Sequence, residues 1–523
     1  MSKVMLASRA GALLGLLVAS NAYAGGYEIP ENTTRALGRA GANIASVDDA
    51  SAIYLNPAGM ASVDGVSISF SLNLPLVMQR MQRSPLHYAA QNTLNEYTIE
   101  YTEERNKLSF MPAPMLFVAY DFGLKNTVFG FGAYGPSASP SSRWPMLSED
   151  NLAPSPTSPV RTHEGSTAYQ MIRSNLLVVY PSFTVAHKFE DIGLSIGGAL
   201  QIAYGYTDVA VGLEGITGIQ TLGDATVRTP DNPSGVLFTE DPASFVEARV
   251  RTGGFGITGN FGLRYEPSES WAVGLSYRPA HKIRMKGTFE MIESPALQAF
   301  DLQLVSDEAR MTVQMPHVLR GGVAYRHVVD GFEVFDLELA ATYEMWSIVN
   351  KMIAETPGPI SSVAFANREI ANVEIPFYFK NTVSLRLGGD YNGLLDRSTG
   401  QGLVLRGGLF WESNGQPKEY SNIFFMPYQR VGLSAGLSYN FQRVSLDFGV
   451  LWLHAFERTV DNGELNIINP LWVCLDPNAL PGQEAALAAA CEANGGASPY
   501  HAVNNGTFKS DHLSISAGMT WNW

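Results

Sequence analysis

The feature that most restricts the fold of this chain is a strict alternation of apolar and polar residues near its C-terminal end. From residue 431 to residue 441 every odd position is apolar, and every even position is small or polar. Because successive side chains of a β-strand point to opposite faces, this pattern predicts a strand with one apolar face. The alternation resumes after Gln442 and Arg443, which predicts a tight hairpin, and a final run ends the chain at Trp523.

The same alternation recurs along the chain and predicts 14 strands. They are 66–74, 116–122, 127–134, 175–188, 192–202, 255–265, 273–277, 319–326, 335–344, 383–391, 403–412, 430–441, 444–452 and 512–523. Charged residues recur on one face of several strands while the other face is apolar. An even number of such strands predicts a closed, antiparallel transmembrane β-barrel with a water-filled lumen and a lipid-facing exterior. A soluble β-sandwich fits less well, because it would need both faces of its sheets to be exposed to water.

The connections between the predicted strands alternate between short and long. The short ones are 123–126, 190–191, 267–270, 328–331, 392–401 and 442–443, and the long ones include 139–168, 210–248, 353–373 and 456–509. Short periplasmic turns and long external loops are typical of an outer-membrane barrel.

The N-terminal residues differ from the rest of the chain. A positively charged start is followed by the short apolar run Ala10–Ala19 and by the cleavage pattern Ala22-Tyr23-Ala24, so residues 1–24 are predicted to be a secretory signal peptide. That run is too short for a membrane anchor, which needs roughly 20 residues. Residues 25–62 predict a small helical element that cannot bury a core of its own, and residues 63–523 are predicted to form the barrel.

Composition excludes some classes of function. The formal net charge of −14 and the lack of a Lys/Arg cluster argue against a nucleic-acid partner.

Two stretches match the nucleophile motif G-x-S-x-G, at 193–197 and 432–436. Both lie within unbroken strand alternation, whereas the motif requires a sharp turn into a helix. The sequence therefore predicts no enzyme.

Two cysteines, Cys474 and Cys491, lie in the longest predicted loop. In an exported protein such a pair is expected to form a structural disulfide. One nearby histidine, His501, does not complete a four-ligand metal set. We expect neither a metal nor a cofactor.

Several motifs resemble the FadL family of outer-membrane transporters for hydrophobic compounds. The resemblance is strongest in Gly25-Gly26-Tyr27, in Leu37-Gly38-Arg39-Ala40 and in the stretch from Asp48 that ends in Asn56-Pro57-Ala58-Gly59-Met60, and it continues to Leu451–His454. It implies a 14-stranded barrel plugged by an N-terminal hatch that includes Gly25, Gly26 and Tyr27, in a protein that imports long-chain fatty acids or aromatic hydrocarbons. Two features depart from the family: only the proline and the arginine of its usual motif are kept at 427–430, and 456–509 is an enlarged last external loop.

The resemblance also implies sideways release of the ligand through a gap near a kinked third strand. That strand contains Gly130 and Gly132 and runs into Gly135-Pro136. Glycine weakens a β-ladder and proline cannot donate a hydrogen bond to it, so these residues are consistent with a local gap in the wall. They are equally consistent with a simple turn at the end of the strand. Asn56, Pro57 and Ala58 are then the hatch residues that meet the kink.

Strand parity gives candidate ligand contacts inside the barrel. Tyr180, Phe410, Leu451 and Leu453 are predicted to face inward, where apolar residues are unusual. Three arginines, Arg320, Arg386 and Arg406, are candidate anchors for a carboxylate, or alternatively partners of the lumen acids Asp390, Glu338 or Glu412.

The expected partners are a hydrophobic small molecule, such as a fatty acid or an aromatic compound, and the lipid and lipopolysaccharide of the bacterial outer membrane. We expect a monomer. Two rival functions are a diffusion porin for small polar solutes and a surface adhesin or structural barrel.

Overall fold

The structure is a computed structural model of the full chain, 1–523. It describes residues 33–89, 96–108, 112–135, 139–152, 154–214, 245–294, 303–355, 358–362, 365–369, 372–466 and 502–523, together with residues 240, 242, 298 and 301. The predictions that concern residues 1–24, Gly25, Gly26, Tyr27, Pro136, Cys474 and Cys491 lie outside the described residues, as does most of the loop 456–509.

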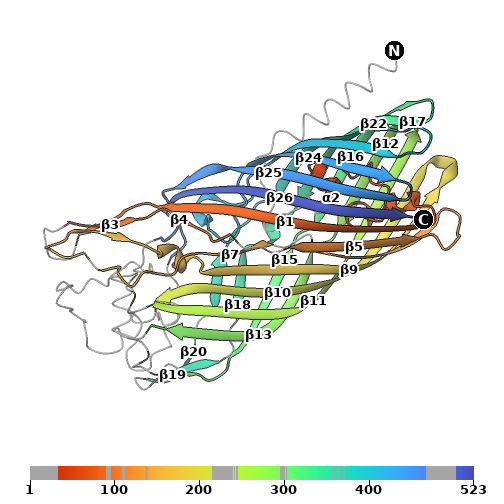
Figure 1. The fold of residues 1–523 in the computed structure, drawn as a ribbon. Helices are drawn as coiled ribbons and strands as arrows, with labels where there is room; N and C mark the ends of the chain where they lie inside the picture. Colours follow the sequence, from red (N-terminus) through yellow and green to blue (C-terminus); the bar gives the residue numbers. More distant parts are fainter. Residues whose placement is uncertain are drawn as a thin grey trace, which may run out of the picture.

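The described chain forms one closed, antiparallel β-barrel of 14 strands, as the sequence predicted (Figure 1). The first six barrel strands are β1 (Val66–Arg83), β5 (Ala113–Tyr120), β6 (Thr127–Tyr134), β9 (Arg173–Phe189), β10 (Leu194–Glu214) and β11 (Phe245–Ser268). The last four are β23 (Gly402–Glu412), β24 (Arg430–Phe441), β25 (Val444–Val460) and β26 (Gly506–Asn522). Strand β26 pairs with β1 from Ser67↔Asn522 to Arg83↔Gly506, so the barrel has no free edge in the membrane.

Between these two groups each barrel strand is built from two segments. They are β12 (Trp271–Arg278) with β13 (His281–Glu293), β15 (Glu308–Met315) with β16 (Val318–Val329), β17 (Phe332–Glu344) with β18 (Lys351–Glu355), and β21 (Val373–Pro376) with β22 (Thr382–Leu395). Two of the interruptions contain a proline, Pro279 and Pro316, which cannot donate to a ladder.

Shorter strands and 3₁₀ turns lie in the connections between the barrel strands. The strands are β2 (Leu86–Ala89), β3 (Glu96–Tyr101), β4 (Glu104–Arg105), β7 (Ser139–Arg143), β8 (Val160–His163), β14 (Gln303–Leu304), β19 (Pro359–Ser362) and β20 (Phe365–Glu369). The single 3₁₀ turns are η2 (Ser166–Tyr169), η3 (Glu190–Ile192), η6 (Trp346–Ile348) and η7 (Lys418–Tyr420). No helix among the described residues is long and apolar enough to cross a membrane.

The alternation of each strand separates lipid-facing from lumen-facing side chains. Leu433 and Leu409 are more than half exposed on the outside of β24 and β23, whereas the neighbouring Ser434 and Arg430 are buried in the interior. On these two strands the predicted alternation therefore assigns the side chains to the correct faces. The strands extend further outward than predicted, because β10 and β11 stay paired up to Glu214↔Phe245, where the sequence suggested a loop.

Residues 33–62 lie inside the barrel as two short helices, α2 (Thr34–Gly38) and α3 (Ala52–Leu55), and the 3₁₀ turn η1 (Pro57–Ser62). Side-chain caps begin two of them: the Thr33 hydroxyl accepts a hydrogen bond from the Ala36 amide, and the Asn56 side chain accepts one from the Ala58 amide. Every hydrophobic residue from Ala36 to Met60 that the segment buries is at most 2% exposed.

Buried charges on the barrel wall hold this segment in place. The Glu338 carboxylate accepts hydrogen bonds from the amides of Ile44 (2.6 Å), Ala45 (3.0 Å) and Ser46 (2.9 Å). The Arg39 guanidinium donates to both oxygens of Asp336, at 2.8 and 2.6 Å. Removing one partner of a buried pair of this kind leaves an uncompensated charge and costs about 3–5 kcal/mol, so the segment is firmly anchored.

Candidate functional site

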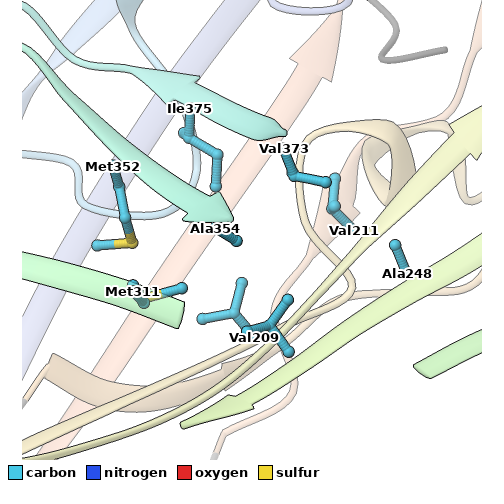
Figure 2. Close-up of a pocket in the computed structure, with 9 residues that line it drawn as sticks. Val209, Val211, Ala248, Met311, Met352, Ala354, Val373 and Ile375 are labelled. Carbon is cyan, nitrogen blue, oxygen red and sulfur yellow. The ribbon is translucent and has the colours of Figure 1, made fainter. Parts of the chain in front are cut away.

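The external half of the barrel interior contains an apolar pocket (Figure 2). Nine residues from five strands line it: Val209 and Val211 on β10, Ala248 and Val250 on β11, Met311 on β15, Met352 and Ala354 on β18, and Val373 and Ile375 on β21. The empty space between them is about 320 Å³ and forms a narrow slit. Such a slit favours a slim apolar ligand, and the two flexible methionines allow it to widen.

The pocket is continuous with the apolar core that reaches the third barrel strand. Its residues belong to the same packed cluster as Trp346, between β17 and β18, as Phe377, between β21 and β22, and as Phe117 and Tyr134 beside β6. All four of these aromatic side chains are at most 1% exposed. An apolar path therefore links the external pocket to the wall of the barrel.

The lower end of this path is a group of aromatic rings. The Tyr134 ring lies 5.4 Å from Phe117, 5.3 Å from Tyr54 of α3 and 6.0 Å from Tyr180 of β9, measured between ring centroids. The Tyr180 hydroxyl hydrogen-bonds to the Nε2 atom of His281, 3.1 Å away. These rings are fully buried and offer apolar faces with a few polar edges, as ligand pockets usually do.

The third barrel strand is interrupted beside these rings. Its pairs to β9 end at Tyr134↔Tyr180, and the next segment, β7, resumes with a shifted register at Ser139↔Leu176. On the other side, the β5–β6 ladder ends at Leu116↔Ala133, although β5 extends to Ala113. The ladder is thus broken from Gly135 onward, next to Tyr134.

The predicted glycines of this strand have a different role from the one suggested by the sequence. Gly130 and Gly132 are paired on both sides, so the strand does not break there. Instead they make room for the N-terminal segment: a Cβ atom on Gly130 would lie 2.5 Å from the sulfur of Met60, and one on Gly132 would lie 3.1 Å from Cγ2 of Ile53.

Asn56, Pro57 and Ala58 were expected to meet the third strand, but they pack against two other strands. A Cβ atom on Gly197 of β10 would lie 2.4 Å from the Pro57 carbonyl carbon, and one on Gly262 of β11 would lie 2.1 Å from Oδ1 of Asn56. The Asn56 amide nitrogen also donates to the Leu263 carbonyl oxygen at 3.0 Å. The segment reaches the third strand through Ile53, Met60 and Tyr54.

The four predicted pocket residues are all buried inside the barrel, but they do not lie together. Tyr180 belongs to the aromatic group beside β6. Phe410, Leu451 and Leu453 form a separate cluster with Leu37 and Ala40 of the N-terminal segment. Their position explains their apolar character, because they pack against α2.

The three candidate arginines differ in their partners. Arg406 pairs with Asp390 (3.2 Å) and Asp447 (2.9 Å), and Arg386 lies 3.5 Å from Glu412. Arg320 has no acidic partner within the described residues; its guanidinium lies 5.3 Å from the Tyr54 ring centroid, and its buried Nη2 atom has no hydrogen-bond acceptor.

A polar chamber lies at the opposite, periplasmic end of the segment. Charged side chains from the segment and from the wall face it, among them Arg35, Asp48, Glu333, Arg406 and Asp447, around an empty volume of about 1350 Å³. A chamber of this character suits water and is a poor environment for an apolar ligand.

A closed barrel with an interior helical segment and an apolar path defines an outer-membrane transport channel. The sequence matches the family described as "Outer membrane protein transport protein (OMPP1/FadL/TodX)" over residues 15–471. The chain belongs to this family; it is a channel for hydrophobic compounds in the bacterial outer membrane and not an enzyme.

Solved structures show the same fold at low sequence identity. A FadL homologue of Pseudomonas aeruginosa is 16% identical, with a TM-score of 0.66 over 95% of this chain and 100% of that chain. The toluene transporter TodX of P. putida is 13% identical, with a TM-score of 0.59 over 95% and 99% of the two chains. The toluene transporter TbuX of Ralstonia pickettii is 14% identical, with a TM-score of 0.54 over 95% and 99%. No curated protein matches the sequence.

Sequence reasoning missed the external pocket. Four of its nine residues, Val211, Ala248, Ala354 and Val373, lie on strand segments that were interpreted as parts of the loops 210–248 and 353–373. A usable signal was present: Val209 and Val211 continue the inward parity of β10 with apolar side chains, where a wet lumen predicts polar ones.

We expect Gly197→Val to displace the N-terminal segment while leaving the barrel intact. The added side chain would collide with backbone atoms of Pro57 and Ala58, which cannot move aside without shifting η1. Hydrogen exchange should speed up in residues 52–62, and ion conductance in planar bilayers should rise. Gly407→Val is the matched control, since a Cβ atom there meets no described atom within 4 Å; equal exchange in the two variants would contradict the assignment.

Proposed function

We propose that the protein captures hydrophobic molecules at its external end and releases them sideways into the outer membrane at the interrupted third strand. The observation that carries this proposal is the single apolar cluster that joins the external pocket to Phe117 and Tyr134 beside the break. An apolar molecule loses about 25 cal/mol of favourable free energy for each Å² that it exposes to water, so it stays on an apolar path.

The exit through the wall is favoured over an exit into the periplasm. The direct route is occupied by residues 33–62 and continues into the polar chamber. Beside the break, in contrast, Val178 and Tyr134 are buried on the inside, and Phe131 and Phe183 are exposed on the outside. A molecule that passes between them remains in apolar surroundings. In this proposal residues 25–62 act as the plug.

Long-chain fatty acids are the ligands that we favour. The narrow pocket suits an extended acyl chain, and Arg320 offers a buried cation without an acidic partner in the described chain, within reach of the aromatic group. The solved relatives TodX and TbuX are described as toluene transporters, so an aromatic hydrocarbon is the second candidate. It would use the aromatic group and would not need Arg320.

The two rival functions make different demands on the interior. A diffusion porin needs an open aqueous lumen, and the packed apolar cluster and the anchored segment oppose it. An adhesin or structural barrel would need neither a buried apolar path nor a cation held inside it.

Filling the external pocket should weaken ligand binding. We expect Ala354→Phe to lower the affinity of purified protein for a fluorescent fatty acid about tenfold or more, which corresponds to about 1.4 kcal/mol. Uptake by cells should fall in parallel. Ala435→Phe, which adds the same ring on the lipid-facing side of β24, should change neither; unchanged binding by Ala354→Phe would exclude the pocket from the route.

Blocking the break should separate binding from release. The Cβ position of Gly135 lies 3.0 Å from the Val178 carbonyl oxygen, so a Gly135→Trp side chain would occupy the interruption. We expect the purified variant to bind the fatty acid with unchanged Kd, while uptake of labelled oleate by cells falls at least about tenfold. Gly407→Trp serves as the control on an open position, and normal uptake by Gly135→Trp would exclude sideways release.

Replacing Arg320 should identify the ligand class. If a carboxylate is bound there, Arg320→Gln loses a charge-assisted hydrogen bond worth about 1.5–3 kcal/mol. Oleate should then bind about 10- to 100-fold more weakly, and oleyl alcohol should be little affected. Arg326→Gln, on the same strand but paired with Glu266 at 3.0 Å, is the control. An equal loss for both ligands would contradict a carboxylate site.

A further inference from the structure

The outer surface of the seventh barrel strand changes character at the interruption between β12 and β13. Below it, the outward residues Trp271, Val273, Leu275 and Tyr277 are apolar and exposed. Above Pro279 and Ala280, the outward residues are Lys282, Arg284 and Lys286, all exposed, while Ile283 and Met285 between them are buried inside the barrel. Three successive lipid-side positions therefore carry a positive charge.

These basic residues lie at the outer boundary of the membrane. Lys282 follows Trp271 by 11 residues along the strand. At ~3.3 Å per residue and a tilt of roughly 40°, this separation is about 28 Å along the barrel axis, just beyond an apolar band that is about 25 Å tall. This is the level of the phosphate groups of the outer leaflet.

The three charges have no acidic partner in the part of the chain that the structure describes. No carboxylate among the described residues forms an ion pair with Lys282, Arg284 or Lys286, whereas neighbouring cations do have acidic partners: Arg310 pairs with Glu308, and Arg251 pairs with Glu290. Arg310 lies opposite Lys286 in the ladder, but its charge is matched by Glu308, so the unpaired cations are the three on β13. Such a patch stands out in a chain whose net charge is −14.

An outward apolar groove lies beside the patch. Its lining consists of Gly198, Ala199, Leu200, Ile257, Thr258, Gly259, Phe261, Pro279 and Ala280, around an empty volume of about 820 Å³. The groove exists because the described ladder of β11 stops at Phe261↔Tyr277 and resumes only at Phe255↔Arg284. Ile257 is 70% exposed within it. The basic patch and the groove meet at Gly256, whose Cβ position would lie 2.4 Å from the Lys282 carbonyl oxygen.

We propose that this surface binds lipid A, the phosphorylated glycolipid of the outer leaflet. Lys282, Arg284 and Lys286 contact its phosphates by charge-assisted hydrogen bonds, and one acyl chain lies in the groove over Ile257. Phosphate complements the unpaired cations, and an acyl chain complements a lipid-facing apolar hollow that only small residues and a strand interruption could create. The site is on the outer wall and is independent of the transport route.

The test compares lipid A that carries two phosphates with its dephosphorylated form, using purified full-length protein and native mass spectrometry. We expect the wild type to prefer the phosphorylated form at least about tenfold, and the triple variant Lys282→Gln, Arg284→Gln, Lys286→Gln to lose this preference. The control removes three exposed cations at the periplasmic turns, Lys125→Gln, Arg397→Gln and Arg443→Gln, and should keep the preference.

A second variant tests the groove. Ala280→Leu should weaken both forms of lipid A by filling the hollow, with the phosphate preference retained. The proposal is overturned if the wild type shows no preference for the phosphorylated form, if the basic triple variant keeps that preference, or if the periplasmic triple variant loses it to the same extent.

Discussion

The structure depends on one constraint, which is that a backbone polar group facing lipid has no partner except another backbone group. Closure of β1 onto β26 meets this requirement around the barrel, so an interruption of the ladder needs an explanation of its own. Two interruptions stand out, after β6 and after β12. Each follows a segment of eight residues that starts at a periplasmic turn, so at ~3.3 Å per residue and a tilt of roughly 40° both lie about 20 Å above that turn, in the outer part of the apolar band.

The interior is divided by the N-terminal segment into two environments. Above it, apolar side chains fill the lumen and connect the external pocket with the third strand. Below it, charged side chains surround the polar chamber. The boundary is held by short-range polar contacts, Glu338 with three successive amides and Arg39 with Asp336, so the segment is fixed where the polarity changes.

Sequence periodicity was sufficient for the barrel but not for the site. Alternation with period two fixes which face each residue occupies, and it placed Tyr180, Phe410, Leu451 and Leu453 in the interior. It does not state which interior residues meet, because that depends on the curvature of the wall and on the position of the segment. Phe410 and Leu451 thus contact α2, and Tyr180 contacts Tyr134 on the neighbouring strand. The roles of Gly130 and Gly197 were hidden for the same reason: an absent side chain indicates either a bend or a close approach, and only the neighbour distinguishes the two.

The long ladder between β10 and β11 has a consequence for where uptake begins. It runs for 21 residues on β10, which is about 70 Å of strand and, at a tilt of roughly 40°, about 54 Å of height. Val209 and Val211 lie in its upper third. The ladder is therefore about twice as tall as the apolar band of about 25 Å, so the pocket lined by Val209 and Val211 stands outside the membrane, on the external side.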